Sequence, residues 1–243
     1  MSETRVPDFS FFQLGGLLRG ETAGLAQGIT SWSTSKTLHL ILVIVLGAGA
    51  FGGAMGSWRA VEQGMWTALK LPLVLIATAA GNALINAMLA PLFGLNLRLR
   101  ESFAAVLASF AFAAAILGAF SPVMFFLVWN VPPPGAGAAP ATAGHGVMLL
   151  TLVVMIAFAG VVSNVRLLGL LRQLGGGAAA AARLLLAWLT INLLLGSQLS
   201  WIARPFIGRA DQPVRIFEPE ALHGNFFEEV MRVVGELWSH FFR

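Results

Sequence analysis

Long apolar runs with almost no charged residues are the feature of this sequence that most limits how it can fold. About 20 apolar residues is the length that an α-helix needs to cross a bilayer. Such runs recur about five times between residues 37 and 207. The sequence therefore predicts an all-α integral membrane helical bundle of about five transmembrane helices, with spans at about residues 37–58, 66–95, 103–129, 147–165 and 184–207.

The composition agrees with a membrane protein and leaves little room for a soluble domain. Of the 243 residues, 57% are hydrophobic and 11% are charged, whereas a soluble domain carries roughly 25% charged residues. The spans, their loops and two tails account for the whole length. Residues 1–36 form an N-terminal tail in which a short interfacial helix and a flexible chain are both open. Residues 208–243 form the C-terminal tail.

The C-terminal tail ends in a predicted amphipathic helix. From Phe226 to Phe242, apolar residues recur with helical spacing, and most charged residues fall on the other side. Asn225 can cap this helix, with Glu228 three residues further on. A wide apolar stripe on a short charged helix indicates contact with a membrane surface or with a partner groove.

Glycines in the first span predict close helix packing. Gly49 and Gly53 form one small-xxx-small pair, and Gly52 and Gly56 form another. This spacing lets two helix backbones approach closely.

Charge and tryptophan positions predict an orientation. Cytoplasmic loops carry excess Lys and Arg, and Trp prefers the membrane interface. With five spans, one side receives Arg5, Arg19, Lys36, Arg98, Arg100, Arg166, Arg172 and Arg183. The opposite side receives only Arg59 and Lys70 before the C-terminal tail, and the 131–146 loop has neither Lys nor Arg. Trp58, Trp66, Trp129 and Trp201 fall near that boundary, with Trp32 and Trp188 near the other. We therefore expect a cytoplasmic N-terminus and a periplasmic C-terminus. Arg204, Arg209 and Arg215 close to the last span count against this side for the tail, and a topology that splits the second span or omits one weak span would place the tail inside.

Polar residues inside spans are candidate functional positions, because they are costly in lipid. Thr78, Asn82 and Asn86 follow at steps of four and share one helical face. That face could line a neutral pore or pack against another helix. Lys70 lies near the predicted boundary, where its ammonium is expected to snorkel towards the interface.

The end of the fifth span carries the densest polar group. Gln198, Ser200, Trp201 and Arg204 lie within seven residues of one another, just before Pro205. Gln198 can hydrogen-bond to another helix, and Arg204 can meet a headgroup or a carboxylate. The group could form a gate, a lipid headgroup site or a subunit contact, or it could simply join helices and anchor the interface.

Several kinds of chemistry are disfavoured. No acidic residue falls inside a predicted span, which argues against proton- or sodium-coupled transport. Cysteine is absent, and the four histidines show no metal-ligand spacing. No catalytic motif, basic run suited to nucleic acid, or cofactor-binding motif is present. The sequence therefore predicts a protein that is not an enzyme, needs no cofactor or metal, and does not bind nucleic acid.

Three stretches carry a resemblance: residues 50–56 (AFGGAMG), 68–73 (ALKLPL) and 196–208 (GSQLSWIARPFIG). Together they resemble a group of bacterial membrane proteins near the Yip1-like five-span families. The resemblance covers most of residues 37–227. It implies a cytoplasmic N-terminus, a non-cytoplasmic C-terminus and a scaffolding or membrane-organising role, and it supplies no catalytic residues.

The leading hypothesis is a scaffold or a subunit of a larger complex in a bacterial inner membrane. Its expected partners are the lipid bilayer and either further copies of the chain or other membrane proteins. One alternative is an oligomeric channel for ions or small solutes, lined by the second span. Another is a lipid-binding protein that uses Gln198, Trp201 and Arg204.

Overall fold

The computed structural model describes residues 33–93, 98–173, 177–208 and 212–241, which form an all-α bundle with no strand among them. This confirms the predicted fold class. The elements are α3 (Thr34–Gly56), α4 (Val61–Leu89), the short 3-10 helix η1 (Ala90–Phe93), α5 (Leu99–Asn130), α6 (Ala138–Gln173), α7 (Gly177–Ala203) and α8 (Phe226–Phe241).

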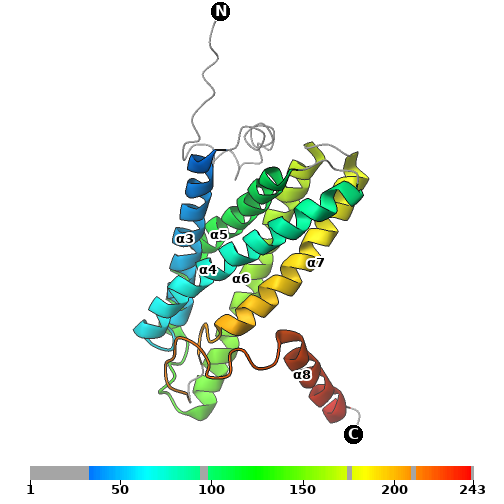
Figure 1. Ribbon diagram of the computed structural model, residues 1–243. Coiled ribbons are helices and arrows are strands. Elements are labelled where there is room, and N and C mark those ends of the chain that lie inside the picture. The colour runs from blue at the N-terminus through cyan, green and yellow to red at the C-terminus, as the bar shows by residue number, and fades with distance from the viewer. Residues whose placement is uncertain (1–32, 94–97, 174–176, 209–211, 242–243) are drawn as a thin grey trace, which may run out of the picture.

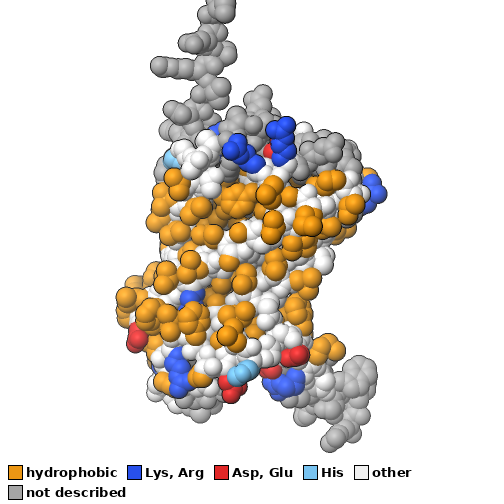
Figure 2. All heavy atoms as spheres, in the orientation of Figure 1, with side chains coloured by type: hydrophobic (Ala, Val, Ile, Leu, Met, Phe, Trp, Pro, Cys, Tyr) orange, Lys and Arg blue, Asp and Glu red, His pale blue; other side chains and the backbone are white. Residues whose placement is uncertain are grey.

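Five of these helices are long and apolar enough to cross a membrane: Thr34–Gly56, Val61–Leu92, Leu99–Asn130, Ala143–Gln173 and Gly177–Ala203. They alternate in direction, so the start of α3 and the end of α7 lie at opposite ends of the bundle (Figure 1). Apolar side chains cover the middle of the molecule, and most charged side chains gather at its two ends (Figure 2). The chain is thus an integral membrane protein by the length and composition of its helices.

Glycines bring the backbone of α3 close to two neighbouring helices. A Cβ atom added at Gly52 would lie 2.7 Å from the Thr67 carbonyl oxygen of α4, and one at Gly56 would lie 2.8 Å from the Gln63 carbonyl oxygen. On another face of α3, a Cβ at Gly118 of α5 would lie 2.8 Å from the Gly47 Cα. Small residues are therefore required where α3 crosses both α4 and α5.

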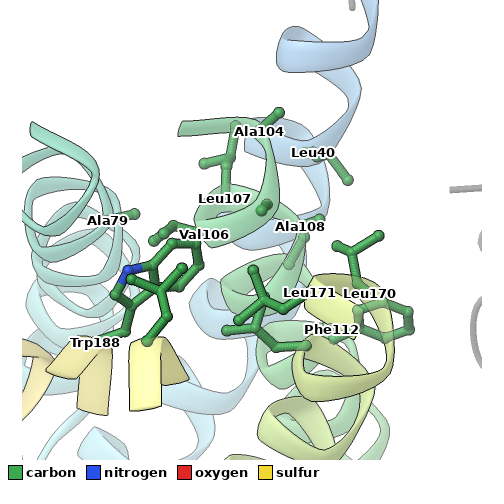
Figure 3. Packing of buried hydrophobic residues seen from close by; sticks show 14 of the residues in the cluster. Leu40, Ala79, Ala104, Val106, Leu107, Ala108, Phe112, Leu170, Leu171 and Trp188 are labelled. Atoms are coloured by element: carbon green, nitrogen blue, oxygen red, sulfur yellow. The ribbon is translucent and has the colours of Figure 1, made fainter. Parts of the chain in front are cut away.

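Two apolar clusters form the core along the bundle. The first contains Leu40, Leu107, Leu171 and Trp188, which come from α3, α5, α6 and α7 (Figure 3). The second lies at the other end of α3, around Phe51, Met55, Trp58, Leu117, Met124, Met148 and Ile207. The other long helices contribute large buried side chains to these clusters, while α4 contributes the buried Ala79, the partly buried Leu71, Leu75 and Ile76, and a buried polar face.

Two tryptophans of the predicted interfacial belts are core residues instead. Trp188 is fully buried, and Trp58 is only 4% exposed and donates its indole N–H to the Pro132 carbonyl at 3.1 Å. Trp129, by contrast, is 81% exposed, as an interfacial ring would be. Trp58 follows directly after α3 and so still lies at an end of the bundle, whereas Trp188 lies in the middle of α7, where its large apolar ring fills the core instead of an interface.

The fourth long helix extends well beyond the predicted span of residues 147–165. It begins at Ala138, inside the stretch expected to be a loop or spacer, and continues to Gln173 through Arg166 and Arg172. Alanine has the highest helix propensity, and arginine is nearly as favourable. The helix therefore continues past its apolar segment at both ends.

The predicted C-terminal helix and its cap are confirmed. The Asn225 side chain accepts a hydrogen bond from the Glu228 backbone N–H at 2.9 Å, and the Glu228 carboxylate accepts one from the Asn225 N–H at 3.2 Å. This reciprocal pair is a capping box. The interfacial helix considered for residues 1–36 falls almost entirely outside the described residues.

Candidate functional site

One face of α4 carries three buried polar side chains near the start of the helix. Gln63, Thr67 and Lys70 are spaced by four and three residues, which places them on one helical face. Lys70 is only 4% exposed, and the other two are fully buried. We call these three residues the α4 clasp.

The α4 clasp binds the backbone that follows α7. Lys70 Nζ donates to the carbonyl oxygens of Ala203 at 3.1 Å and Pro205 at 2.8 Å. Gln63 Nε2 donates to the carbonyls of Pro205 at 2.9 Å and Phe206 at 3.0 Å, and the Thr67 hydroxyl lies 2.5 Å from the Phe206 carbonyl oxygen. Ala203 is the last residue of α7, so its carbonyl is one that the helix end leaves without an intrahelical partner, and Pro205 and Phe206 belong to the backbone just beyond it.

The expectation that Lys70 snorkels to the interface was therefore wrong. Its ammonium points into the protein and lies 5.2 Å from the centre of the Phe217 ring, within the range of a cation–π contact. Backbone carbonyls and aromatic rings replace the water or headgroups that a snorkelling lysine would reach.

Further along the same helix, a cluster of asparagines joins α4 to α7. Asn82 Nδ2 donates to Asn192 Oδ1 of α7, and Asn86 Nδ2 donates to Asn82 Oδ1. Asn82 and Asn86 are fully buried, and the Thr78 hydroxyl donates to the Val74 carbonyl of its own helix. The stripe singled out in the sequence thus joins α7 through Asn82 and packs Thr78 near Gly196, while the hydrogen bonds of Thr78 and Asn86 stay within α4.

The polar group at the end of α7 forms hydrogen bonds to the segment before α8, residues 212–225, which we call the C-terminal extension. The Arg204 guanidinium stacks over the Trp201 ring, 3.6 Å from its centre, and donates to the carbonyls of Trp201 and Glu220. The Trp201 indole donates to the His223 carbonyl at 3.4 Å. Gln198 Oε1 accepts the backbone N–H of Phe226, the first residue of α8, at 3.2 Å.

Next to this group lies an open cavity of about 1120 Å³, which we call the interfacial cavity. Its apolar wall is formed by α6, through Leu149, Leu152, Val153 and Ile156. Its polar side is formed by the end of α7 and the C-terminal extension, which crosses this end of the bundle (Figure 1). That side includes Ser200, Trp201, Arg204, Arg215, Glu218 and Glu220.

The interfacial cavity combines the features of a site for an amphipathic molecule. Leu149 to Ile156 lie inside a candidate span, whereas Arg204 follows the end of one. The cavity therefore runs from the lipid-facing part of the bundle to its polar end. Cavities of this size can bury most of a drug-sized ligand, with apolar walls and a few polar groups that fix its orientation.

Charges of both signs line the polar side. In the described part of the chain, neither Glu218 nor Glu220 forms an ion pair, whereas Glu229 pairs with Arg232. The hydrogen bond from Arg232, and then the charges of Arg232 and Arg204, hold the pKa of Glu229 below its usual value. The Glu229 carboxylate is therefore paired with Arg232. The Glu218 carboxylate lies within electrostatic range of Lys70 but forms no direct ion pair in the described chain, and neither does the Glu220 carboxylate.

The structure brings together some of the predicted site residues and separates others. Ser200, Trp201 and Arg204 line one cavity, and Gln198 holds the helix beside it. Thr78, Asn82 and Asn86 belong to the α4–α7 contact, and Gly49, Gly52, Gly53 and Gly56 belong to the α3–α4 contact. These are three distinct places in the bundle.

Sequence reasoning missed Gln63, Thr67 and Asn192. A signal was present for the first two, because Gln63, Thr67 and Lys70 share the helical spacing used to find the asparagine stripe. Asn192 stands alone in an apolar run, and only its contact with Asn82 reveals its role.

Among the described residues, no group of three His, Asp or Glu side chains is placed to hold a metal ion. No protein-family model, curated protein or solved structure matches this chain.

Proposed function

We propose that this protein is a non-enzymatic integral membrane protein that binds a membrane lipid in the interfacial cavity. The observation that carries the proposal is the cavity itself, with an apolar wall on α6 and a polar side around Arg204. A phospholipid has the same division, with acyl chains at one end and a charged headgroup at the other.

Exposure along α6 supports this assignment. Val153 and Ile156 line the cavity with 64% and 48% of their surfaces exposed. Inside a bilayer, acyl chains cover such exposed apolar side chains, and a bound lipid adds close packing against the wall rather than removal of apolar surface from water. Acyl chains are the apolar groups available inside a bilayer.

The contacts around the cavity support binding over catalysis. The Arg204 guanidinium, the Trp201 indole and the Gln198 amide bond to backbone groups of the C-terminal extension and α8. These side chains shape and close the site. A lipid held beside the extension also fits the membrane-organising role implied by the resemblance to Yip1-like proteins.

We further propose that the protein lies in a bacterial inner membrane with its N-terminus in the cytoplasm and its C-terminus in the periplasm. Arg98, Arg100, Arg172 and Arg183 lie at the end of the bundle where α3 begins, as an excess of cytoplasmic positive charge requires. In this orientation the interfacial cavity opens in the periplasmic half of the bilayer.

A scaffold or complex subunit remains a second candidate, because α8 projects away from the bundle (Figure 1) and exposes Phe227, Val230 and Met231. These residues offer an apolar surface to a partner or to the membrane. A channel lined by the second span has less support, because Asn82 and Asn86 are buried against α7. A pore along them would require α4 and α7 to separate.

The test is lipid retention after purification in mild detergent, measured by native mass spectrometry. Val153→Trp places a large ring in the cavity and is expected to reduce lipid occupancy about tenfold, the effect of about 1.4 kcal/mol. Val161→Trp is the matched control, because Val161 lies on the same helix, is also 64% exposed and does not line the cavity. Equal lipid retention by the two variants would contradict the proposal.

A further inference from the structure

The polar side of the interfacial cavity presents positive and negative groups that are not paired with one another. Arg204 and Arg215 supply positive charge, and Glu218 and Glu220 supply negative charge. Arg204 meets Glu220 only through the Glu220 backbone carbonyl, at 3.3 Å. A headgroup that carries one charge of each sign therefore matches this lining better than a purely anionic one.

Arg204 is suited to the phosphate of such a headgroup. A guanidinium has five N–H donors in a planar fork that matches phosphate oxygens. The hydrogen bonds of Arg204 to Trp201 and Glu220 hold the fork in place, and stacking on the Trp201 ring fixes its plane. The remaining N–H donors are available to a ligand.

Glu218 is suited to an ammonium group on the same headgroup. Its backbone N–H donates to the Arg204 carbonyl at 3.2 Å, and this hydrogen bond holds Glu218 next to Arg204. Glu218 lines the cavity, and its carboxylate lies within electrostatic range of Lys70 without forming a direct ion pair in the described chain. A primary ammonium has three N–H donors for carboxylate oxygens, whereas a quaternary ammonium has none and is bound by aromatic faces.

The aromatic face nearest to Arg204 is already occupied. The Trp201 ring is covered on one side by the Arg204 guanidinium, and the rings of Phe206 and Phe217 lie over Lys70 Nζ. Phe226 also lines the cavity, with its ring packed edge-to-face against Phe227. A carboxylate accepts the N–H donors of a primary ammonium, which an aromatic face matches less well.

We propose that the interfacial cavity selects a zwitterionic phospholipid with a primary ammonium, with Arg204 on the phosphate and Glu218 on the ammonium. This inference rests on the proposed lipid-binding function and names its ligand class. The α6 wall holds the acyl chains, so the soluble headgroup without chains is expected to bind far more weakly than the intact lipid.

The experiment uses the full chain in nanodiscs with equal parts of phosphatidylethanolamine, phosphatidylcholine and phosphatidylglycerol, followed by native mass spectrometry of the bound lipid. Phosphatidylethanolamine is expected to be enriched over each of the other two by about tenfold, the effect of one hydrogen bond to a charged group. Glycerophosphoethanolamine, added alone, is expected to leave the bound lipid in place. Displacement by this chain-free headgroup at a similar concentration would overturn the role of the α6 wall.

Glu218→Gln is expected to abolish the enrichment over phosphatidylglycerol. The substitution keeps the side-chain shape and leaves the backbone hydrogen bond to Arg204 unchanged. Glu62→Gln is the control, since Glu62 is an exposed carboxylate in the first turn of α4, outside the cavity. The control is expected to keep the enrichment of the original chain.

The outcomes separate this inference from the proposed function. Bound lipid that Val153→Trp removes, but whose composition equals that of the nanodisc, would overturn the headgroup assignment and leave the lipid site intact. An enrichment that survives Glu218→Gln would overturn the role of Glu218. Absence of bound lipid in the original chain would overturn the lipid site and the headgroup assignment together.

Discussion

At the scale of single residues, Lys70 illustrates how a buried cation is accommodated in an apolar bundle. Its ammonium donates to the carbonyls of Ala203 and Pro205, which are 133 and 135 residues away in the chain. The cost of burying a charge falls when hydrogen bonds replace those to water. Lys70 therefore holds the backbone at the end of α7 in place, and the carbonyls of that backbone stabilise the buried ammonium.

We expect Lys70→Met to destabilise the protein by about 1–3 kcal/mol, because it leaves the carbonyl of the buried Ala203 without its side-chain donor, whereas Pro205 keeps Gln63. The measurement is equilibrium unfolding in mixed micelles. Arg100→Met also removes one positive charge, but Arg100 is exposed at the start of α5, so a change within about 0.5 kcal/mol is expected there. If both variants were equally stable, the α4 clasp would not hold the end of α7.

The same residue shows what the sequence pattern could indicate and what it could not. The spacing of Gln63, Thr67 and Lys70 indicates a polar helical face. Whether that face meets lipid headgroups, water or protein depends on where the chain after α7 passes, which no local pattern contains.

At the scale of elements, α3 packs through glycines at two separate crossings. The small-xxx-small pattern of Gly52 and Gly56 occurs at the crossing with α4, and Gly47 meets Gly118 at the crossing with α5. The sequence indicated close approach at the first crossing but not its partner helix. The second crossing was missed, although Ala114 and Gly118 have the same small-xxx-small spacing and both lie against Gly47.

Alanine substitutions at neighbouring glycines provide a matched test of this packing. Gly52→Ala places a Cβ atom 2.7 Å from the Thr67 carbonyl oxygen, which forces the helices apart and is expected to cost about 1–3 kcal/mol. Gly53→Ala meets its nearest atom, Ala68 Cβ, at 3.6 Å, an ordinary contact, and alanine favours the helix by up to about 1 kcal/mol. Gly53→Ala should therefore be neutral or stabilising.

Thermal unfolding in detergent is the measurement for both variants. An equal loss of stability in Gly52→Ala and Gly53→Ala would contradict the crossing described above, because of these two glycines only Gly52 lies directly against the α4 backbone.

At the scale of the whole molecule, the described chain contains an odd number of candidate spans, five in all. The start of α3 and the extension that carries α8 lie at opposite ends of the bundle (Figure 1). The interfacial cavity belongs to the end that carries α8. Its lining comes from segments that meet only when the bundle is complete.

Topology reporters test this arrangement. A periplasm-dependent phosphatase fused after Arg243 is expected to be active, and the same enzyme inserted in the link at residues 174–176 is expected to be inactive, because an odd number of spans separates the two positions. Fluorescent protein fusions at the same positions should show the reverse pattern. Activity at both positions would contradict the five-span arrangement, and exchange of the two results would reverse the proposed orientation.

The sequence by itself determined the all-α membrane class, the five spans and the capped C-terminal helix, because span length, apolar content and capping depend on residues close together in the chain. It could also single out Ser200, Trp201 and Arg204, since polar residues at the end of an apolar run stand out. Only the tertiary structure decided that these residues line a cavity with α6, that Lys70 and Trp188 point inward, and that Asn82 meets Asn192. Each of these depends on which helices become neighbours, and that is determined by packing between segments far apart in the sequence.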